Sequence, residues 1–138
     1  MNYYTYFEHP ADVGIEGIGA TIEEAFEQAA SAMFNLIVDI EKVKPQSKVQ
    51  IHCQGEDVEE LFIDWLNTLL AQADIHSMVF CRFKIDRLQG SYLTGYAEGE
   101  ELNQEKHKIK LEVKAATYCM LEVGRGQGGY FARCVVDV

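Results

Sequence analysis

The spacing of apolar residues predicts two amphipathic helices. Apolar side chains recur at helical spacing over residues 22–37 and again over residues 58–73. Each stretch follows a pair of side chains that can bind the exposed backbone N–H groups of a first helical turn: Thr21 with Glu24, and Asp57 with Glu60. We therefore expect each helix to bury one face in the core.

Strand-like patterns cover most of the remaining chain. The expected strands are residues 3–8, 13–18, 48–53, 78–88, 92–98, 109–123 and 130–138. The 109–123 run is longer than an ordinary strand, so we expect a break near Ala115 and Ala116. Turns are expected at 89–91 and 124–129, and a polar loop at 98–105.

The order of these elements indicates the fold class. Helices lie early in the chain and antiparallel strands late, which indicates α+β rather than a doubly wound parallel sheet. The 138 residues contain no internal repeat and no linker, and 48% are apolar, which is enough for a real core. We expect a single domain over residues 1–138, with two amphipathic helices packed on a mostly antiparallel β-sheet.

The charge limits what such a domain can bind. The formal net charge is −10 at pH 7. Nucleic-acid backbones are bound mainly through Lys and Arg, so we expect no direct grip on nucleic acid. An acidic protein suits a cation or a basic protein partner, although many acidic proteins are simply soluble.

The cysteines and the apolar runs indicate a compartment. None of the four cysteines is in C-x-x-C spacing, and each lies in an apolar, strand-like run: Cys53, Cys81, Cys119 and Cys134. Buried free thiols in a reducing cytosol are favoured over disulfides or zinc ligands. The sequence shows no signal-peptide pattern and no apolar run near the ~20 residues of a membrane span. We expect a cytoplasmic protein without membrane contact.

Carboxylates at the two ends of the chain form the candidate site. Asp12 lies where the first strand breaks at Pro10, and the sequence ends with Asp137 and the terminal carboxylate of Val138. If the two ends are neighbours, three carboxyl groups converge, and their repulsion requires a proton or a cation. The residues alone leave a structural alternative open, in which Asp12 caps a turn and Asp137 ends a strand.

Several short motifs together resemble the archease family. They occur in the family's order and span nearly the whole chain: His9-x-Ala11-Asp12-Val13-Gly14, Thr21-Ile22-Glu23-Glu24-Ala25-Phe26, Ala32-Met33-Phe34-Asn35-Leu36, Gly55-Glu56-Asp57-Val58-Glu59-Glu60-Leu61, Asp64-Trp65-Leu66-Asn67, Lys106-His107, Val113-Lys114-Ala115-Ala116-Thr117-Tyr118 and Val136-Asp137-Val138. Two positions depart from the family's pattern: Pro10 stands where Thr is usual, and Cys119 stands where His often follows Thr-Tyr.

This resemblance implies an accessory protein of RtcB-type RNA ligases, which join RNA ends in tRNA splicing and RNA repair with GTP and manganese. An archease is not itself an enzyme; it helps the ligase acquire GMP on its active-site histidine and turn over repeatedly. The family also binds a divalent cation, typically calcium. Carried over to this chain, the ligands would be Asp12, Asp137 and the terminal carboxylate of Val138, and such oxygen donors also suit magnesium or manganese.

Five further residues are candidate contacts. His9 is a candidate support for the cation site or a contact to the partner, and a strand-end histidine bound to the backbone is the alternative. Lys106, His107 and Lys114, together with Lys110, form a basic patch that is a candidate docking surface for the ligase or its GTP. A solvated strand face is the plainer interpretation of that patch.

Two other function classes stay open. A metal-dependent phosphohydrolase would use the same carboxylates, although His9 is the only candidate base or nucleophile beside them. A general chaperone-like binding protein would be expected to expose apolar surface rather than carboxylates.

Overall fold

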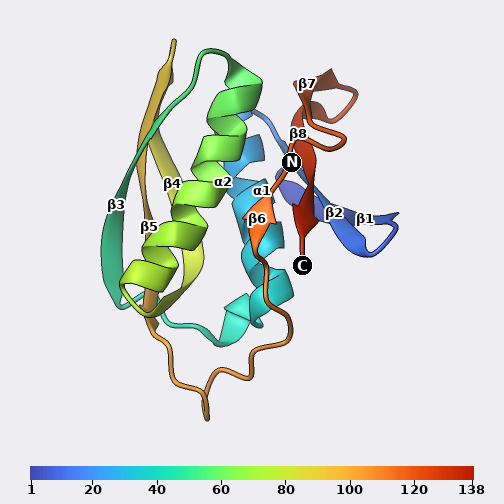
Figure 1. Ribbon diagram of the computed structural model, residues 1–138. Helices are drawn as coiled ribbons and strands as arrows, with labels where there is room; N and C mark the ends of the chain where they lie inside the picture. Colours follow the sequence, from blue (N-terminus) through green and yellow to red (C-terminus); the bar gives the residue numbers. More distant parts are fainter.

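Two helices lie between two antiparallel β-sheets, as Figure 1 shows for the computed structural model, which describes all residues from Met1 to Val138. The first sheet has the strand order β1-β2-β8-β6, with β7 also paired to β8, and the second has the order β3-β5-β4. The strands are β1 (Tyr3–His9), β2 (Asp12–Gly19), β3 (Ser47–Gln54), β4 (Met78–Gln89), β5 (Tyr92–Glu101), β6 (Ala115–Ala116), β7 (Glu122–Gly126) and β8 (Gly129–Asp137). The α+β class is confirmed.

The helices are α1 (Ile22–Ile37) and α2 (Val58–Ile75), with a short 3-10 helix, η1 (Ile40–Lys42), after α1. Both predicted caps are present: the side chains of Thr21 and Asp57 accept hydrogen bonds from the backbone N–H groups of Glu24 and Glu60. No helix combines the length and the apolar character that crossing a bilayer requires.

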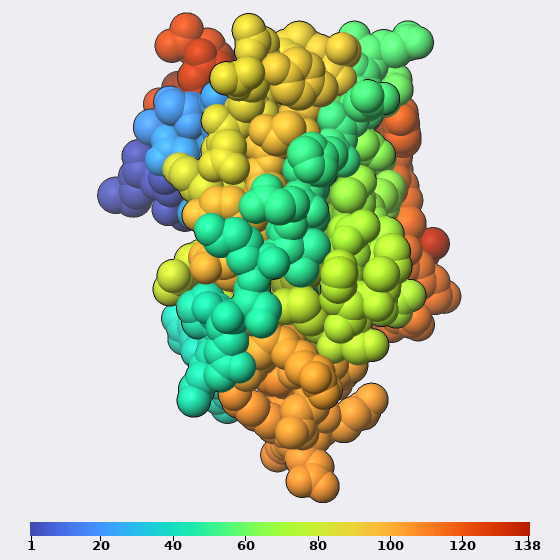
Figure 2. Space-filling view, turned by 90° about the vertical axis from the view of Figure 1, so that its left-hand side faces the viewer, coloured from blue at the N-terminus to red at the C-terminus, as the bar shows by residue number.

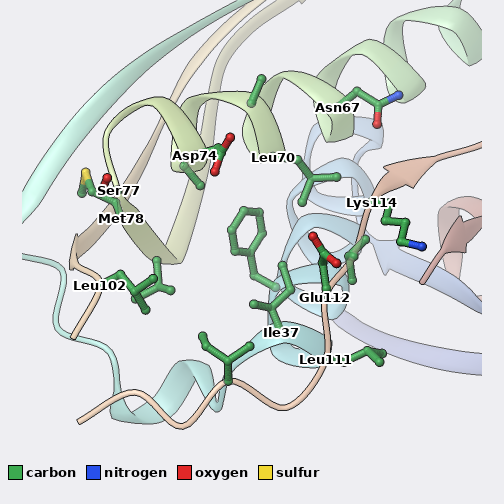
Figure 3. A pocket seen from close by; sticks show the side chains of 16 residues that line it. Ile37, Asn67, Leu70, Asp74, Ser77, Met78, Leu102, Leu111, Glu112 and Lys114 are labelled. Atoms are coloured by element: carbon green, nitrogen blue, oxygen red, sulfur yellow. The ribbon is translucent and has the colours of Figure 1, made fainter. Parts of the chain in front are cut away.

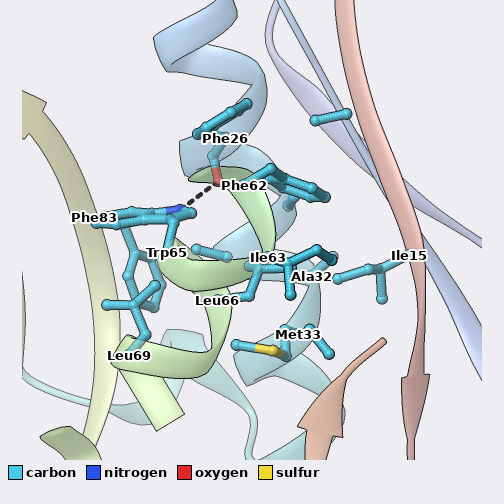
Figure 4. Packing of buried hydrophobic residues seen from close by; sticks show 14 of the residues in the cluster. Ile15, Phe26, Ala32, Met33, Phe62, Ile63, Trp65, Leu66, Leu69 and Phe83 are labelled. Carbon is cyan, nitrogen blue, oxygen red and sulfur yellow. Dashed lines mark hydrogen bonds between the residues drawn. The ribbon is translucent and has the colours of Figure 1, made fainter. Parts of the chain in front are cut away.

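The core fills the space between the sheets and around both helices. Figure 4 shows Trp65 of α2 pointing toward α1, where its Nε1 donates to the carbonyl oxygen of Phe26 at 3.0 Å. The Phe26 ring lies 4.9 Å from the Phe62 ring, measured between centroids. These contacts hold the two helices together at the centre of the molecule.

Close packing of α1 on the first sheet depends on Gly17 in β2. A Cβ atom at this position would lie 2.1 Å from the carbonyl oxygen of Ala25. Only glycine lets the backbones of strand and helix approach this closely. The face of β2 that carries Gly17 is therefore the helix-facing one, and the opposite face, which carries Asp12, is the outer one.

The expected long strand over residues 109–123 is wrong. Only β6 and the start of β7 form within it, and residues 102–114 run irregularly along the lower edge of the molecule, below the outer face of the β3-β5-β4 sheet in Figure 2. Ile109, Leu111 and Val113 line a cleft beside the ends of the helices, and of the three only Val113 is buried. An alternating apolar pattern indicates only that one side of a segment packs on the protein, and a helix surface can cover that side as well as a sheet can.

Two boundaries also differ from expectation. β5 continues to Glu101, so the loop expected to begin at residue 98 starts only after this strand. β7 includes three residues of the glycine-rich stretch and pairs with β8, which reduces the turn to Gln127 and Gly128. Gly129 closes this turn with φ +115°, a conformation that side chains other than glycine's rarely allow.

Candidate functional site

The first hairpin carries Asp12 at its base. His9 of β1 pairs with Asp12 of β2 across a two-residue turn, Pro10–Ala11, in which Ala11 has φ 64°. Proline followed by a residue of positive φ is the pattern of the two central positions of a type II turn. The first of these positions donates no backbone hydrogen bond within the turn, so a proline there loses none. Pro10 therefore fits this hairpin, although it departs from the usual residue of the family that the motifs resemble.

The C-terminal end of the chain lies against this hairpin. β2 pairs with β8 in a register that joins Val13 to Val136, and one further step sets Asp12 opposite Asp137. Residues directly opposite in antiparallel strands project their side chains from the same face of the sheet. The backbone N–H of Val138 donates to Asp12 Oδ1 at 3.4 Å, so the terminal residue lies against this carboxylate.

The donor set of this acidic pole, defined here as Asp12, Asp137 and Val138, consists of oxygen atoms only. No group of three or more His, Cys, Asp or Glu side chains in the structure is arranged to hold a metal ion. Asp12 and Asp137 are two carboxylates, fewer than the three side-chain ligands of a recognisable metal cluster. Oxygen donors of this kind fit hard cations such as calcium, magnesium or manganese and do not fit a zinc site of Cys and His.

A shallow hollow of about 630 Å³ adjoins the pole, and His9 and Asp12 both line it. Asp12 is half-buried and Asp137 is exposed, so both carboxylates can be reached from solvent. The pole is therefore accessible from solvent without any opening of the core.

His9 contacts a thiol rather than a backbone group. Its Nε2 lies 3.4 Å from Cys119 Sγ, and its Nδ1 is buried without a hydrogen-bond partner. The expectation that all four thiols are buried is wrong for Cys119, which is exposed, and for Cys81, which is half-buried. Cys119 follows β6 in a loop that leaves the sheet, so the strand pattern of its neighbours does not predict its exposure.

Three residues of the expected basic patch lie in different environments. His107 is only 1% exposed, so its ring is not available to a partner, and its expected place on a docking surface is wrong. Lys106 binds Glu100, with its Nζ 2.8 Å from Oε1. Lys114 is exposed, and its backbone N–H donates to the carbonyl oxygen of Asp137 at 2.8 Å, which puts it beside the acidic pole.

Lys114 also borders a cleft of about 710 Å³, which Figure 3 shows between α2 and the 102–114 segment. Its lining is mostly apolar and includes Ile37 from α1, Leu70 from α2 and Leu111 from the segment. The cleft thus lies where the irregular segment packs on the helix ends, and Lys114 is the basic residue that connects it to the pole.

Glu100 is a buried charge that the sequence pattern missed, because the polar run over residues 98–105 predicts a loop. Three donors surround its carboxylate: Lys106 Nζ at 2.8 Å, His107 Nε2 at 2.8 Å and the backbone N–H of Lys44 at 2.9 Å. Burial raises the pKa of Glu100, but these hydrogen bonds outweigh burial and lower the pKa to about 2. The cluster fastens the start of the irregular segment to β5.

Replacing Glu100 by Gln should destabilise the protein by about 1–3 kcal/mol at neutral pH, because buried donors lose a charged acceptor. The folded pKa lies below the ordinary 4.5, so ionised Glu100 contributes its full stabilisation above pH 4.5 and loses it as the pH falls toward 2. Urea unfolding from pH 7 down to pH 2 should show the difference between parent and variant shrinking over that range. The exposed neighbour Glu101→Gln is the control, and an equal effect of both substitutions would contradict the role of Glu100.

The comparison with protein families decides the identity of this chain. Residues 4–138 match the family described as Archease protein family (MTH1598/TM1083). The chain belongs to the archease family. Curated relatives named protein archease agree: the one from Pyrococcus furiosus is 42% identical over 100% of both chains, and the one from Methanosarcina mazei is 39% identical over 98% of this chain and 95% of the relative.

Solved archease-like structures share the fold. The solution structure of Methanobacterium thermoautotrophicum protein 1598 is 36% identical, has a TM-score of 0.84 and is covered over 98% of each chain. A Thermotoga maritima archease, described as a possible chaperone, has a TM-score of 0.62 at 19% identity, with 96% of this chain and 94% of that chain covered. At that identity the second structure supports the archease fold alone.

Proposed function

We propose that this archease is a protein cofactor of an RtcB-type RNA ligase, that it promotes the ligase's guanylylation by GTP and its repeated turnover, and that it is not itself an enzyme. The observation that carries the proposal is the contact between Asp12 and the backbone of Val138, which gathers the acidic pole at one end of the first sheet. Membership of the family over nearly the whole chain supports it.

In this proposal the pole holds a divalent cation, with calcium, magnesium and manganese all compatible with its oxygen donors. A bound cation would supply a local positive charge toward which an oxygen of the ligase's nucleotide centre can be oriented. Asp12 and Asp137 project from the same outer face of the sheet, and the Val138 N–H orients the Asp12 carboxylate. These residues would therefore present the cation outward, toward a partner.

The surface beside the pole fits a protein partner. Tyr118 is 64% exposed and Met120 is 54% exposed, and they flank Cys119, whose thiol touches His9. Exposed aromatic and methionine side chains are enriched where proteins contact one another. A few apolar side chains beside carboxylates suit one defined, partly basic partner better than the broad apolar surface of a general chaperone.

A metal-dependent phosphohydrolase fits the pole less well. The only imidazole near the carboxylates, that of His9, has its Nε2 directed at Cys119 Sγ and its Nδ1 buried. It is therefore not aimed at a water that a cation at Asp12 and Asp137 would activate. Hydrolysis of phosphate esters that is lost in Asp12→Ala would instead favour the enzyme.

The deciding experiment is a guanylylation assay of the cognate ligase with radiolabelled GTP, with and without this protein. The expected result is faster formation of the ligase–GMP adduct and more than one ligation per ligase molecule. The control is bovine serum albumin at the same concentration, which detects general protection of the ligase. Equal adduct formation with either protein would overturn the proposal.

The terminal carboxylate has its own test. Extending the chain by Gly-Ser after Val138 moves that carboxylate, so the affinity for calcium and manganese should fall by roughly 10-fold or more, as expected when a ligand of a weak oxygen site is lost. Isothermal titration calorimetry measures this affinity. The same dipeptide added before Met1, which is almost fully exposed, is the matched control. Unchanged affinity in the C-terminal extension would show that Val138 is not a ligand.

A further inference from the structure

The four thiols differ sharply in their environments. Burial raises the pKa of Cys53 and of Cys134 to about 12, and it also raises the pKa of Cys81. The thiolate is the reactive form of cysteine, so these three side chains are poor nucleophiles at neutral pH. Cys119 is the one exposed cysteine.

Backbone and side-chain bonds hold Cys119 in a defined place. Its carbonyl oxygen accepts from the N–H of Val135 at 3.0 Å, and its own N–H donates to Thr117 Oγ1 at 3.3 Å. The same Thr117 hydroxyl donates to the carbonyl oxygen of Val135 at 2.7 Å. The loop is thereby fastened to β8, and the thiol of Cys119 is presented to β1 rather than left to move in solvent.

The group that the thiol meets is the imidazole of His9. The distance from Sγ to Nε2 is 3.4 Å, and His9 makes no other side-chain hydrogen bond, since its Nδ1 is buried without a partner. With the proton on Nδ1, Nε2 can accept the proton of the thiol. A thiol paired with an imidazole is the arrangement that activates cysteine nucleophiles.

We propose that Cys119, with His9 as its proton acceptor, is a modification site at which hydroperoxides oxidise this protein. The thiol proton passes to His9 Nε2, and the sulfur attacks the terminal oxygen of the hydroperoxide. An S–O bond forms as the O–O bond breaks, the sulfur gives up two electrons, and the departing oxygen takes the proton from His9 and leaves as water or an alcohol. The product is the sulfenic acid of Cys119, which a second thiol can reduce.

The location gives this oxidation a consequence. His9 is the direct cross-strand neighbour of Asp12. An oxygen atom added to Cys119 Sγ would therefore contact the His9 imidazole, next to the acidic pole. Nothing in the oxidation itself requires a cation or a ligase. It can therefore be tested on the purified chain alone, independently of the proposed function.

The experiment treats the folded chain with hydrogen peroxide, traps sulfenic acid with dimedone and identifies the labelled cysteine by mass spectrometry. Cys119 should be labelled at least about 10-fold faster than any of the three other cysteines. His9→Gln should slow that labelling by roughly 10-fold or more, because glutamine cannot take up the proton. His52→Gln, which removes an exposed imidazole from β3, should leave the rate unchanged.

A second measurement separates chemistry from folding. In concentrated urea the parent and His9→Gln should be labelled at Cys119 at the same rate, because unfolding separates residue 9 from Cys119. An equal rate for both proteins in the folded state would overturn the role of His9. Faster labelling of Cys81, or equal labelling of all four cysteines in the folded chain, would overturn the site itself.

Discussion

Replacing Asp12 or Asp137 by Asn is expected to reduce the stimulation of ligase guanylylation to the level seen without this protein. Asparagine keeps the shape of the side chain but removes one negative charge from the pole, and hard cations depend on carboxylate ligands. The affinity for calcium should fall by roughly 10-fold or more in each variant. The assay is adduct formation with GTP, combined with calorimetric titration of the cation.

Folding should not be affected by these changes. Asp137 is exposed and Asp12 is half-buried, and in Asp12→Asn the amide oxygen of the new side chain can still accept the Val138 N–H. The free energy of unfolding should therefore stay within about 0.5 kcal/mol of the parent. Asp86→Asn, which removes an exposed carboxylate from β4, is the matched control. Full stimulation by both pole variants would contradict the cation-site mechanism.

Replacing Trp65 by Ala should cost roughly 3–5 kcal/mol of stability, the usual range for deleting a large buried aromatic side chain. Trp65 is completely buried and is the largest of the fully buried side chains. It also joins α2 to the backbone of α1 through Phe26. Since domains are commonly stable by only about 5–15 kcal/mol, this loss would leave the fold marginal.

Urea unfolding followed by circular dichroism measures this effect. Trp65→Phe keeps an aromatic ring and loses the N–H donor, so it should cost clearly less than the alanine variant. Tyr92→Ala is the surface control, because this aromatic residue is 38% exposed. A loss below about 1 kcal/mol in Trp65→Ala, the size typical of an average substitution, would show that Trp65 does not hold the helices together.

The helices were predictable because their signals are local. The capping pairs at Thr21 and Asp57 lie within one helical turn, and the apolar stripes that follow describe the faces that are buried. The hairpins were also largely predictable, since adjacent strands need only a suitable turn between them.

The failures share a different cause. The run from Ile109 alternates as a strand does, but its backbone N–H groups find partners elsewhere: Lys110 donates to the carbonyl oxygen of Ile37 at the end of α1. Alternation reports only that one side is buried, not what covers it. Glu100 was missed for the same reason, because its donors come partly from Lys44, which lies far away in the sequence.

The sequence by itself determined the two helices, most strands and which residues carry carboxylates. Only the tertiary structure decided which of these residues are neighbours. Asp12 meets Val138, and His9 meets Cys119, across more than a hundred residues each, through the pairing of β2 with β8 and the loop that follows β6. Such contacts depend on strand order and register, which arise from burial of the whole sheet against α1 and leave no local mark along the chain.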